Sequence, residues 1–512
     1  MKSLVLTLGH NSSAVVIEDG HILGGYENER ITGIKSDSQF PRQAIDELKK
    51  QIDLVGCNIY VSHWFLNGEL PKDDIKHWDP DYIHTYFSDS PIYSHTPKCT
   101  HHDGHMWSAE VFVGEDFPDH HTLVVDGFGT HGECISVYYN RDRIVRYYGF
   151  HQSVGLLYQY ATDFCGMKMH QDEYKMLGYE TLISTLDVDI DQLNYIIDYV
   201  DNFFDTTQGN HKETDLTWLS YTKEVVHGHL NKFILHIETQ YYKKFGINEI
   251  RILISYYVQR HLENVISGIV KGLNPTNLVV SGGVFYNVKL NSLLCDMVLG
   301  KFSVMPLAGD QGAGLGVYQY YKKDLKWPGH LFWGKRSLLR NEDDICKNLY
   351  QNGMVNLIRG SMEFGPRALG NTSTLAIPIM ENVNKINKMN NRTTIMPMAL
   401  VVTEEQAQDL FVDIDKVHKS LEYMVMARDF KPGKHIGLEG GALFYPHQMK
   451  WTCRPQITTD STLIDLLNTF GPLINTSANY HGQPIVFSMD QIQFMNDKQN
   501  EIYPINTIIS ED

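Results

Sequence analysis

The most chemically suggestive stretch of the chain is HHDGHMWSA, residues 101–109. If this stretch is helical, His101 and His105 lie on one face, while His102 points about 100° away. Two imidazole nitrogens then converge on one point in space. The spacing therefore indicates a metal site, provided that carboxylates reach it from elsewhere in the chain.

Two aspartates are the candidate carboxylates. Asp126 follows the apolar segment TLVV and should end a buried strand, and Asp310 lies in the glycine-rich turn PLAGDQGAGLG. Two histidines and two aspartates form a mixed nitrogen and oxygen set that suits iron or zinc. Such a set leaves positions for water or a substrate phosphate. An isolated HxxxH pair is more often an ordinary surface or core pair, so the spacing alone does not decide the matter.

Two segments that would position these residues share one plan. They are LVLTLGHNSSAVVIEDGHILGGYENE and TLVVDGFGTHGECISVYYNRDRIVRYYGF. Each has the pattern strand, turn, strand, turn, strand, and His10 and Asp126 lie at the first turns. A duplicated unit of this kind is typical of actin-like and sugar-kinase-like folds, in which both first turns face a shared cleft. The pattern predicts an α/β fold with a duplicated N-terminal part.

The rest of the chain alternates helical and strand-rich regions. Residues 155–270 carry apolar residues at helical spacing, as in LNYIIDYVDNFF. The glycine-rich turns of NLVVSGGVFYN and PLAGDQGAGLG each open into a helix, an arrangement that suits a nucleotide phosphate. A basic segment with Pro and Gly at 322–336 indicates a boundary between a domain at 1–330 and a smaller α/β domain at 340–512.

Composition excludes several classes of protein. The net charge of −17 argues against non-specific nucleic-acid binding, and the chain has no apolar run of the roughly 18 residues that a membrane helix needs. The seven cysteines never form a CxxC pair, which fits a reducing cytoplasm. We therefore expect a cytoplasmic protein. The sequence does not fix its oligomeric state, for which a homodimer is one candidate.

Several separate motifs, in order along nearly the whole chain, resemble those of the O-carbamoyltransferases of the NodU/CmcH type. They are GHNSSA (9–14), YENERITGIKSDSQFP (26–41), HHDGH (101–105), VVDGFG (124–129), EYKMLG (173–178), SGGVFYN (281–287), GDQGAGLG (309–316), MEFGPRALGN (362–371) and NTSANYHGQPIV (475–486). The resemblance implies an actin-like N-terminal domain similar to the enzyme that makes threonylcarbamoyl-adenosine in transfer RNA. It also implies a YrdC-like C-terminal domain.

The resemblance also assigns roles to residues. His101, His105, Asp126 and Asp310 would be the ligands of Fe(II) or Zn(II). His10 would be the base for the acceptor hydroxyl, and Lys175 a second catalytic residue. The nucleotide-binding and anion-binding residues would be Gly282, Gly283, Asn287, Gly312, Gly314, Arg359, Arg367, Lys388, Arg392, Arg454, Ser477 and Asn479.

The implied activity has two steps. ATP, with Mg(II), and carbamoyl phosphate would give carbamoyl-adenylate at the C-terminal site, where a cluster of cations is needed because two anions meet. The carbamoyl group would then pass to a hydroxyl of a small-molecule acceptor at the metal site. The sequence does not show whether the adenylate stays inside the protein.

The sequence departs from the family at three places that bear on this activity. Asn11, in the HNSS turn beside His10, stands where the family has an acid. Met396 stands where the family has an arginine, and YETL replaces an APYG-like stretch after EYKMLG. The acceptor pocket is therefore expected to differ from one that holds a bulky sugar.

Three other functions fit parts of the sequence. An actin-like metallohydrolase or peptidase would use the HxxxH site, although no HExxH glutamate is present. A regulatory ATPase would not need His10 or the cations. A third alternative keeps the carbamoyl transfer but uses a hydroxymethyl-pyrimidine nucleotide as the acceptor, with a base stacked on Tyr195, Phe203, Phe204 or Trp218.

Overall fold

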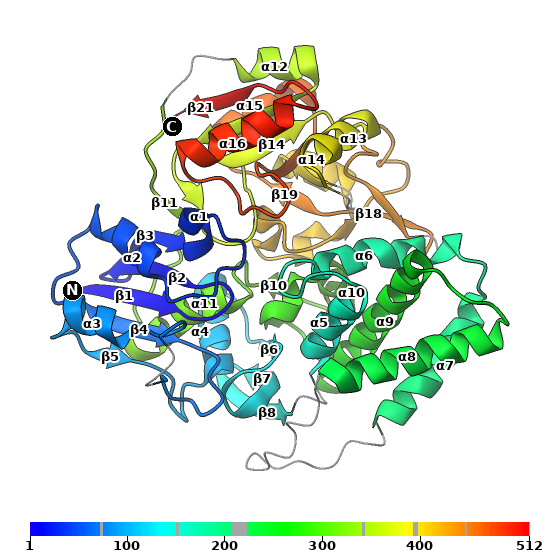
Figure 1. Ribbon diagram of the computed structural model, residues 1–512, viewed down its shortest axis with the longest axis horizontal. Helices are drawn as coiled ribbons and strands as arrows, with labels where there is room; N and C mark the ends of the chain where they lie inside the picture. The colour runs from blue at the N-terminus through cyan, green and yellow to red at the C-terminus, as the bar shows by residue number, and fades with distance from the viewer. Residues whose placement is uncertain are drawn as a thin grey trace.

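The computed structural model describes residues 1–71, 75–149, 153–205, 223–339, 344–392, 398–445 and 448–510. The fold is mixed α/β, with three main sheets that lie in distinct parts of the molecule (Figure 1). The strands β1–β10 are Lys2–Thr7, Ser13–Glu18, His21–Glu27, Asn58–Ser62, Ile92–Tyr93, His121–Val125, Glu133–Tyr139, Asp142–Tyr148, Leu278–Ser281 and Phe302–Val304. The first and last helices of this part, α1 and α11, are Asn28–Thr32 and Asp310–Lys322.

The first two sheets have the same topology. One has the order β3-β2-β1-β4-β5 and the other the order β8-β7-β6-β9-β10. In each, the first three strands run antiparallel and the last two are parallel to the first. This repeat is the duplication that the sequence pattern predicts. The inner strands are apolar on both faces, as in β6 (HTLVV), because helices cover them.

Helices connect the strands of each half. The helices α2–α10 are Arg42–Lys49, Pro80–Phe87, His101–Val113, Val154–Phe164, Glu173–Thr181, Ile190–Asp205, Lys223–Gln240, Ile247–Leu273 and Val288–Met297. The region from α5 to α9 is the helical part that the sequence predicts between 155 and 270. These helices lie beside the second sheet, away from the first (Figure 1). No helix among the described residues is both long and apolar enough to cross a bilayer.

The third main sheet belongs to the C-terminal part of the chain. It has six strands in the order β19-β15-β20-β14-β12-β21. The strands β11–β21 are Phe332–Gly334, Met354–Arg359, Met362–Glu363, Thr372–Ala376, Ala399–Val402, Arg428–Asp429, Leu443–Tyr445, Lys450–Cys453, Pro455–Ile457, Leu473–Ser477 and Thr507–Ser510. The helices α12–α16 are Ile345–Asn352, Met380–Met389, Glu404–Leu410, Ser461–Phe470 and Met489–Asn500.

The C-terminal part packs closely on the N-terminal part. The largest apolar cluster includes Leu307 and Phe302 from the N-terminal part, and Met426 and Leu400 from the C-terminal part. The division at 330–340 stays a prediction, because this apolar core is continuous across it.

Candidate metal centre and active site

The structure brings the four predicted metal ligands together. The Nε2 atoms of His101 and His105 lie 3.2 and 3.3 Å from Asp126 Oδ2, and 3.4 and 3.6 Å from Asp310 Oδ1. The two Nε2 atoms are 3.1 Å apart. One ligand atom from each residue falls within 4.8 Å of all the others.

These separations fit a single metal ion. Ligand atoms that each bind one ion at about 2.1 Å lie roughly 3.0–3.4 Å apart when they are neighbours in its coordination sphere. The two carboxylates bring two negative charges into a place where both histidines are at most 1% exposed. Buried charges of one sign need a counter-charge, and the mixed nitrogen and oxygen set suits zinc or iron.

The ligands occupy corresponding positions in the two halves of the repeat. His101 begins α4, which follows β5, and Asp310 begins α11, which follows β10. The turn after β1 carries His10, and the turn after β6 carries Asp126. The duplicated topology therefore places four functional side chains around one point. Both helices also direct the positive ends of their dipoles there, which favours anions.

Two glycines let the ligand-bearing helices touch. A Cβ atom on Gly316 of α11 would lie 1.7 Å from the Gly104 carbonyl oxygen of α4, and a Cβ on Gly104 would lie 2.9 Å from the Ala313 carbonyl oxygen. Any larger residue at 316 would push the helices apart. Their close approach sets the distance between His101 and Asp310.

Caps fix the start of α4. The Thr100 hydroxyl and the Asp103 carboxylate form a capping box, in which Asp103 Oδ2 accepts the Thr100 N–H at 2.8 Å. Glu133 accepts hydrogen bonds from the His102 N–H and the Thr100 hydroxyl, and pairs with Arg146 at 3.1 Å. Burial raises the pKa of Glu133 to about 7, although Arg146 opposes the shift. The helix end is thus anchored to β7 and β8.

Backbone contacts orient the His101 ring. Its Nδ1 lies 3.2 Å from the carbonyl oxygen of His63, so the Nδ1–H donates there and the Nε2 lone pair faces the other ligands. The His63 N–H in turn donates to His95 Nε2, and His95 Nδ1 donates to the Cys99 carbonyl. Burial lowers the pKa of His95 far below its usual value, so that ring stays neutral. Sequence reasoning missed this support, because His63 and His95 belong to none of the recognised motifs.

Metal affinity should rise with pH. Burial disfavours charge on His101 and His105, but Asp126 and Asp310 outweigh it and raise the pKa of both rings. Without an ion the rings therefore hold protons at higher pH than ordinary histidines, and a metal has to displace them. We expect the apparent affinity to increase by up to about tenfold per pH unit for each proton displaced. Competition with a chelator at pH 6, 7 and 8 measures this, and an affinity that does not change with pH contradicts it.

A cavity of about 440 Å³ opens beside the four ligands. Asp126, Asp310 and His10 line it, and His10 Nδ1 lies 4.0 Å from Asp310 Oδ2. The His10 ring also contacts the His170 ring at a tilt of 31°, with 4.5 Å between centroids. The predicted base therefore lies at the same cavity as the metal ligands.

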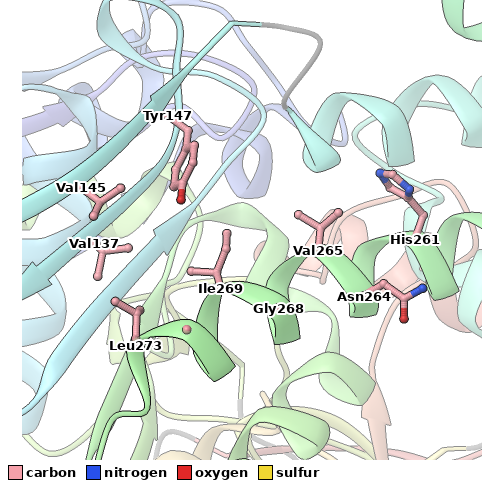
Figure 2. Close-up of a pocket in the computed structure, with 10 residues that line it drawn as sticks. Val137, Val145, Tyr147, His261, Asn264, Val265, Gly268, Ile269 and Leu273 are labelled. Atoms are coloured by element: carbon pink, nitrogen blue, oxygen red, sulfur yellow. The ribbon is translucent and has the colours of Figure 1, made fainter. Parts of the chain in front are cut away.

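A larger cavity, of about 570 Å³, lies between β7, β8 and α9. Figure 2 shows Val137, Val145 and Tyr147 on the strands facing Ile269 and Leu273 on the helix. Its lining is mostly apolar and includes none of the predicted site residues. The smaller cavity is therefore the candidate active site.

Two predicted arginines of the C-terminal part, Arg367 and Arg454, have buried guanidinium groups that interact electrostatically. Burial, together with the positive charge of Arg367, lowers the pKa of Arg454 to about 9. Burial also lowers the pKa of Arg367, whose guanidinium lies 5.8 Å from the centre of the Tyr286 ring. Within the described ranges, Arg367 Nε is buried without a hydrogen-bond acceptor. Both groups remain cationic near pH 7, and an anion between them would relieve their repulsion.

A third predicted arginine, Arg392, donates hydrogen bonds to the TSAN motif at 476–479. Arg392 donates to Thr476 Oγ1, to Asn479 Oδ1, and to both the carbonyl and the hydroxyl of Ser477, at 2.8 to 3.2 Å. Burial raises the pKa of Tyr174 of α6, and the positive charges of Arg392 and Arg367 oppose that shift. This helix of the N-terminal part therefore lies within electrostatic range of the two arginines. The structure thus brings Arg367, Arg392, Arg454, Ser477 and Asn479 into one region.

Other predicted residues have structural contacts of their own. Arg359 pairs with Asp460 at 2.8 Å, and Lys388 is exposed on α13, 5.5 Å from the Tyr503 ring. Lys175 pairs with Asp172 at 2.8 Å, and Asn287 caps α10 and donates to Gln259. These contacts give each side chain a role within the protein.

The predicted glycines lie against protein atoms. Cβ atoms on Gly312 and Gly314 would meet the Leu307 carbonyl and the Thr7 hydroxyl at 2.2 and 2.6 Å, so protein fills the space that we expected a nucleotide to approach. A Cβ on Gly282 would lie 2.2 Å from the Val125 carbonyl, and one on Gly283 would lie 2.9 Å from Asp126 Oδ1. Gly283 therefore leaves room for a metal ligand.

A buried carboxylate connects the two parts of the chain. Glu27, at the end of β3, accepts the Gly365 N–H at 3.1 Å, and Arg30 donates to the Gly365 carbonyl at 2.6 Å. Glu27 also pairs with Arg30 at 2.9 Å and accepts from Gln311 at 3.4 Å. Gly365 belongs to the loop of Arg367, and Gln311 follows the ligand Asp310. The motif YENER and the motif EFGPRA each suggested importance, but their contact could not be predicted from sequence.

Replacing Glu27 by alanine should destabilise the fold strongly. The change leaves Arg30 buried without its main partner and the Gly365 N–H without an acceptor, which typically costs about 3–5 kcal/mol. Thermal unfolding of the variant measures the loss. Glu381→Ala is the control, because Glu381 forms an exposed pair with Lys385, and its melting temperature should stay close to that of the unchanged protein. Equal melting temperatures for both variants would contradict the role of Glu27.

Of the four aromatic residues that the nucleotide alternative would use to stack a base, Tyr195 has a described side chain, and it lies away from the cavity. Tyr195 on α7 is 73% exposed and does not line it. Trp218, the Phe203 and Phe204 side chains, and Met396 lie outside the described part of the structure. The cavity is instead lined by other aromatic residues, which include Trp64, Phe128 and Tyr160.

Comparison with known proteins identifies relatives over most of the chain. An uncharacterized protein of Methanocaldococcus jannaschii, MJ1051, is 27% identical, with 93% of each chain covered. Nodulation protein NolNO of Sinorhizobium fredii is 25% identical over 94% of this chain and 76% of its own. The 3'-hydroxymethylcephem-O-carbamoyltransferase of Amycolatopsis lactamdurans is 27% identical over 42% of this chain and 45% of its own.

Two family descriptions match adjoining parts of the chain. Residues 91–318 match Carbamoyltransferase N-terminus, and residues 346–511 match Carbamoyltransferase C-terminus. The first match contains all four residues of the metal cluster, and the second contains the three clustered arginines. The comparisons give no support to the metallohydrolase alternative. The chain belongs to the carbamoyltransferase family of the NodU/CmcH type, and it is an enzyme.

Proposed function

We propose that the protein is an ATP-dependent O-carbamoyltransferase that uses carbamoyl phosphate and a small-molecule hydroxyl acceptor. The observation that carries this proposal is the cluster of His101, His105, Asp126 and Asp310 at a cavity that also holds His10. The carbamoyltransferase family and the relative that is named an O-carbamoyltransferase support the same reaction.

In the first step, carbamoyl phosphate and water give carbamate and phosphate. A carbamate oxygen then attacks the α-phosphorus of ATP, and pyrophosphate leaves with the bridging oxygen and the electrons of its broken bond to the α-phosphorus. The product is carbamoyl-adenylate. This step brings anions together, and the buried guanidinium groups of Arg367 and Arg454 offer the charge that it needs. We assign it to the C-terminal part, as a YrdC-like domain within 340–512.

In the second step, the acceptor hydroxyl attacks the carbamoyl carbon, and AMP leaves with the electrons of the broken carbon–oxygen bond. His10 accepts the hydroxyl proton, which its place at the cavity allows. When bound, Fe(II) or Zn(II) supplies Lewis-acid stabilisation to the phosphate that leaves. Mg(II) accompanies ATP in the first step.

Pyrophosphate release without an acceptor tests the proposal. The intact protein is incubated with ATP and carbamoyl phosphate, and pyrophosphate is compared with a sample that lacks carbamoyl phosphate. We expect release only when both substrates are present. Equal release in both samples would indicate simple ATP cleavage. If no pyrophosphate appears with or without an acceptor, the proposed function is wrong.

A further inference from the structure

The cavity beside the metal ligands has an unusual lining for a site in a protein that handles phosphates. It contains aromatic side chains, among them Trp64, Phe128 and Tyr160, and uncharged polar ones such as Ser38 and Gln159. It contains no lysine or arginine, and its only carboxylates are the metal ligands Asp126 and Asp310. Among the described residues, the lining thus carries no fixed positive charge.

One tryptophan is held firmly at this lining. Trp64 lies against the turn that carries His10. The contact is so close that a Cβ atom on Gly9 would lie 2.8 Å from atoms of the Trp64 ring. Its ring meets His77 and Phe128 edge to face, at 77° and 88°, with 5.9 Å between centroids in both pairs. A rigid indole that borders the cavity next to the base is a surface on which a flat ring can stack.

Charge restricts what can lie there. In the proposed transfer step a metal ion at Asp126 and Asp310 would serve the phosphate of the adenylate. A second phosphate, carried by the acceptor, would meet that negative charge without a lysine or arginine among the described lining residues, and desolvating it would not be compensated. An uncharged ring carries no such cost and gains contact with the aromatic side chains. The cations that suit a phosphate lie instead in the C-terminal part, at Arg367 and Arg454.

We propose that this cavity is the acceptor site and that it selects an uncharged, planar ring compound with a hydroxymethyl or hydroxyl group. Trp64 is the specificity-determining residue: the ring stacks on its indole and the hydroxyl reaches His10. A nucleoside fits this description, whereas a nucleotide does not. The inference rests on the proposed carbamoyl transfer and adds the acceptor class to it.

Matched pairs of acceptors that differ by one charged group test the selection. Transfer of labelled carbamoyl is measured for 5-hydroxymethyl-2'-deoxycytidine and its 5'-monophosphate, and for N-acetylglucosamine and glucosamine. We expect the nucleoside to be carbamoylated with at least about tenfold higher kcat/KM than its monophosphate and than either sugar. Calorimetry with the same compounds measures binding without turnover. A preference for the monophosphate, for glucosamine or for either sugar would overturn the proposal.

A substitution separates the acceptor ring from the adenine of the donor. Trp64→Leu should raise KM for the nucleoside about tenfold, with little change in KM for ATP. Trp107→Leu is the control, because Trp107 is a partly buried tryptophan of α4 that packs near Tyr320 and does not line the cavity. Melting temperature and metal content show that both variants fold.

The outcomes are distinct. If Trp64→Leu raises KM for ATP instead, the ring holds the donor, and the acceptor inference is wrong. If pyrophosphate is released but none of the four compounds is bound or carbamoylated, the acceptor inference fails and the adenylation step stands. If the unchanged protein releases no pyrophosphate under any condition, the proposed function fails, and this inference fails with it.

Discussion

His105→Ala should remove the bound metal and reduce the rate of carbamoyl transfer by more than about 100-fold. Replacing a residue that only supports a metal ligand can already cost up to roughly 100-fold, and His105 is itself a predicted ligand. His105 is fully buried, and its Nε2 lies between 3.1 and 3.6 Å from ligand atoms of His101, Asp126 and Asp310. Its loss leaves three ligands and an open space, and both carboxylates keep their charge. Elemental analysis of the purified variant and a transfer assay measure the two effects.

The neighbouring histidine provides the control for this experiment. His102 is equally buried on the same helix, but its Nδ1 bonds to Ser136 Oγ at 2.8 Å, away from the cluster. His102→Asn should therefore keep its metal, although it can lower stability. Acceptor-independent pyrophosphate release by His105→Ala should continue, because we assign that step to the C-terminal part. Full metal content in His105→Ala would show that the cluster is not the metal site.

Arg367→Ala should reduce pyrophosphate release by about 10² to 10³-fold. The Arg367 guanidinium is near the cation Arg454, and its Nε has no hydrogen-bond acceptor among the described residues. This N–H can donate to an incoming phosphate without first losing another acceptor. Arg367→Lys keeps the positive charge but loses the bidentate hydrogen-bonding geometry of the guanidinium. Its rate of pyrophosphate release should therefore lie between those of the alanine variant and the unchanged protein. Pyrophosphate release measured at several ATP concentrations gives both rates.

A distant arginine controls for loss of positive charge in general. Arg141 pairs with Glu110 at 2.9 Å and is about half exposed, so Arg141→Ala should release pyrophosphate normally. Metal content should not change in either variant. If Arg367→Ala releases pyrophosphate normally but no longer transfers the carbamoyl group, the loop of Arg367 serves the second step, and our assignment of the first step is wrong.

Local sequence patterns determined the elements that carry the site. The spacing of His101 and His105 predicts their common face, because a helix repeats every 3.6 residues. Thr100 and Asp103 cap that helix where the pattern begins. The two strand-turn-strand segments predict the repeated sheets, because alternating apolar runs and short turns are local properties. Asp126 could be placed at a strand end for the same reason.

The tertiary structure alone decided what meets at the cavity. Trp64 and His170 line it because separate loops converge there, and neither belongs to a metal-binding pattern. The contact between Glu27 and Gly365 joins residues 338 positions apart. Gly104 and Gly316 set the distance between α4 and α11, and hence the position of Asp310 beside the histidines. Helix and strand periodicity act over a few residues, whereas these contacts depend on how whole sheets and helices pack against one another.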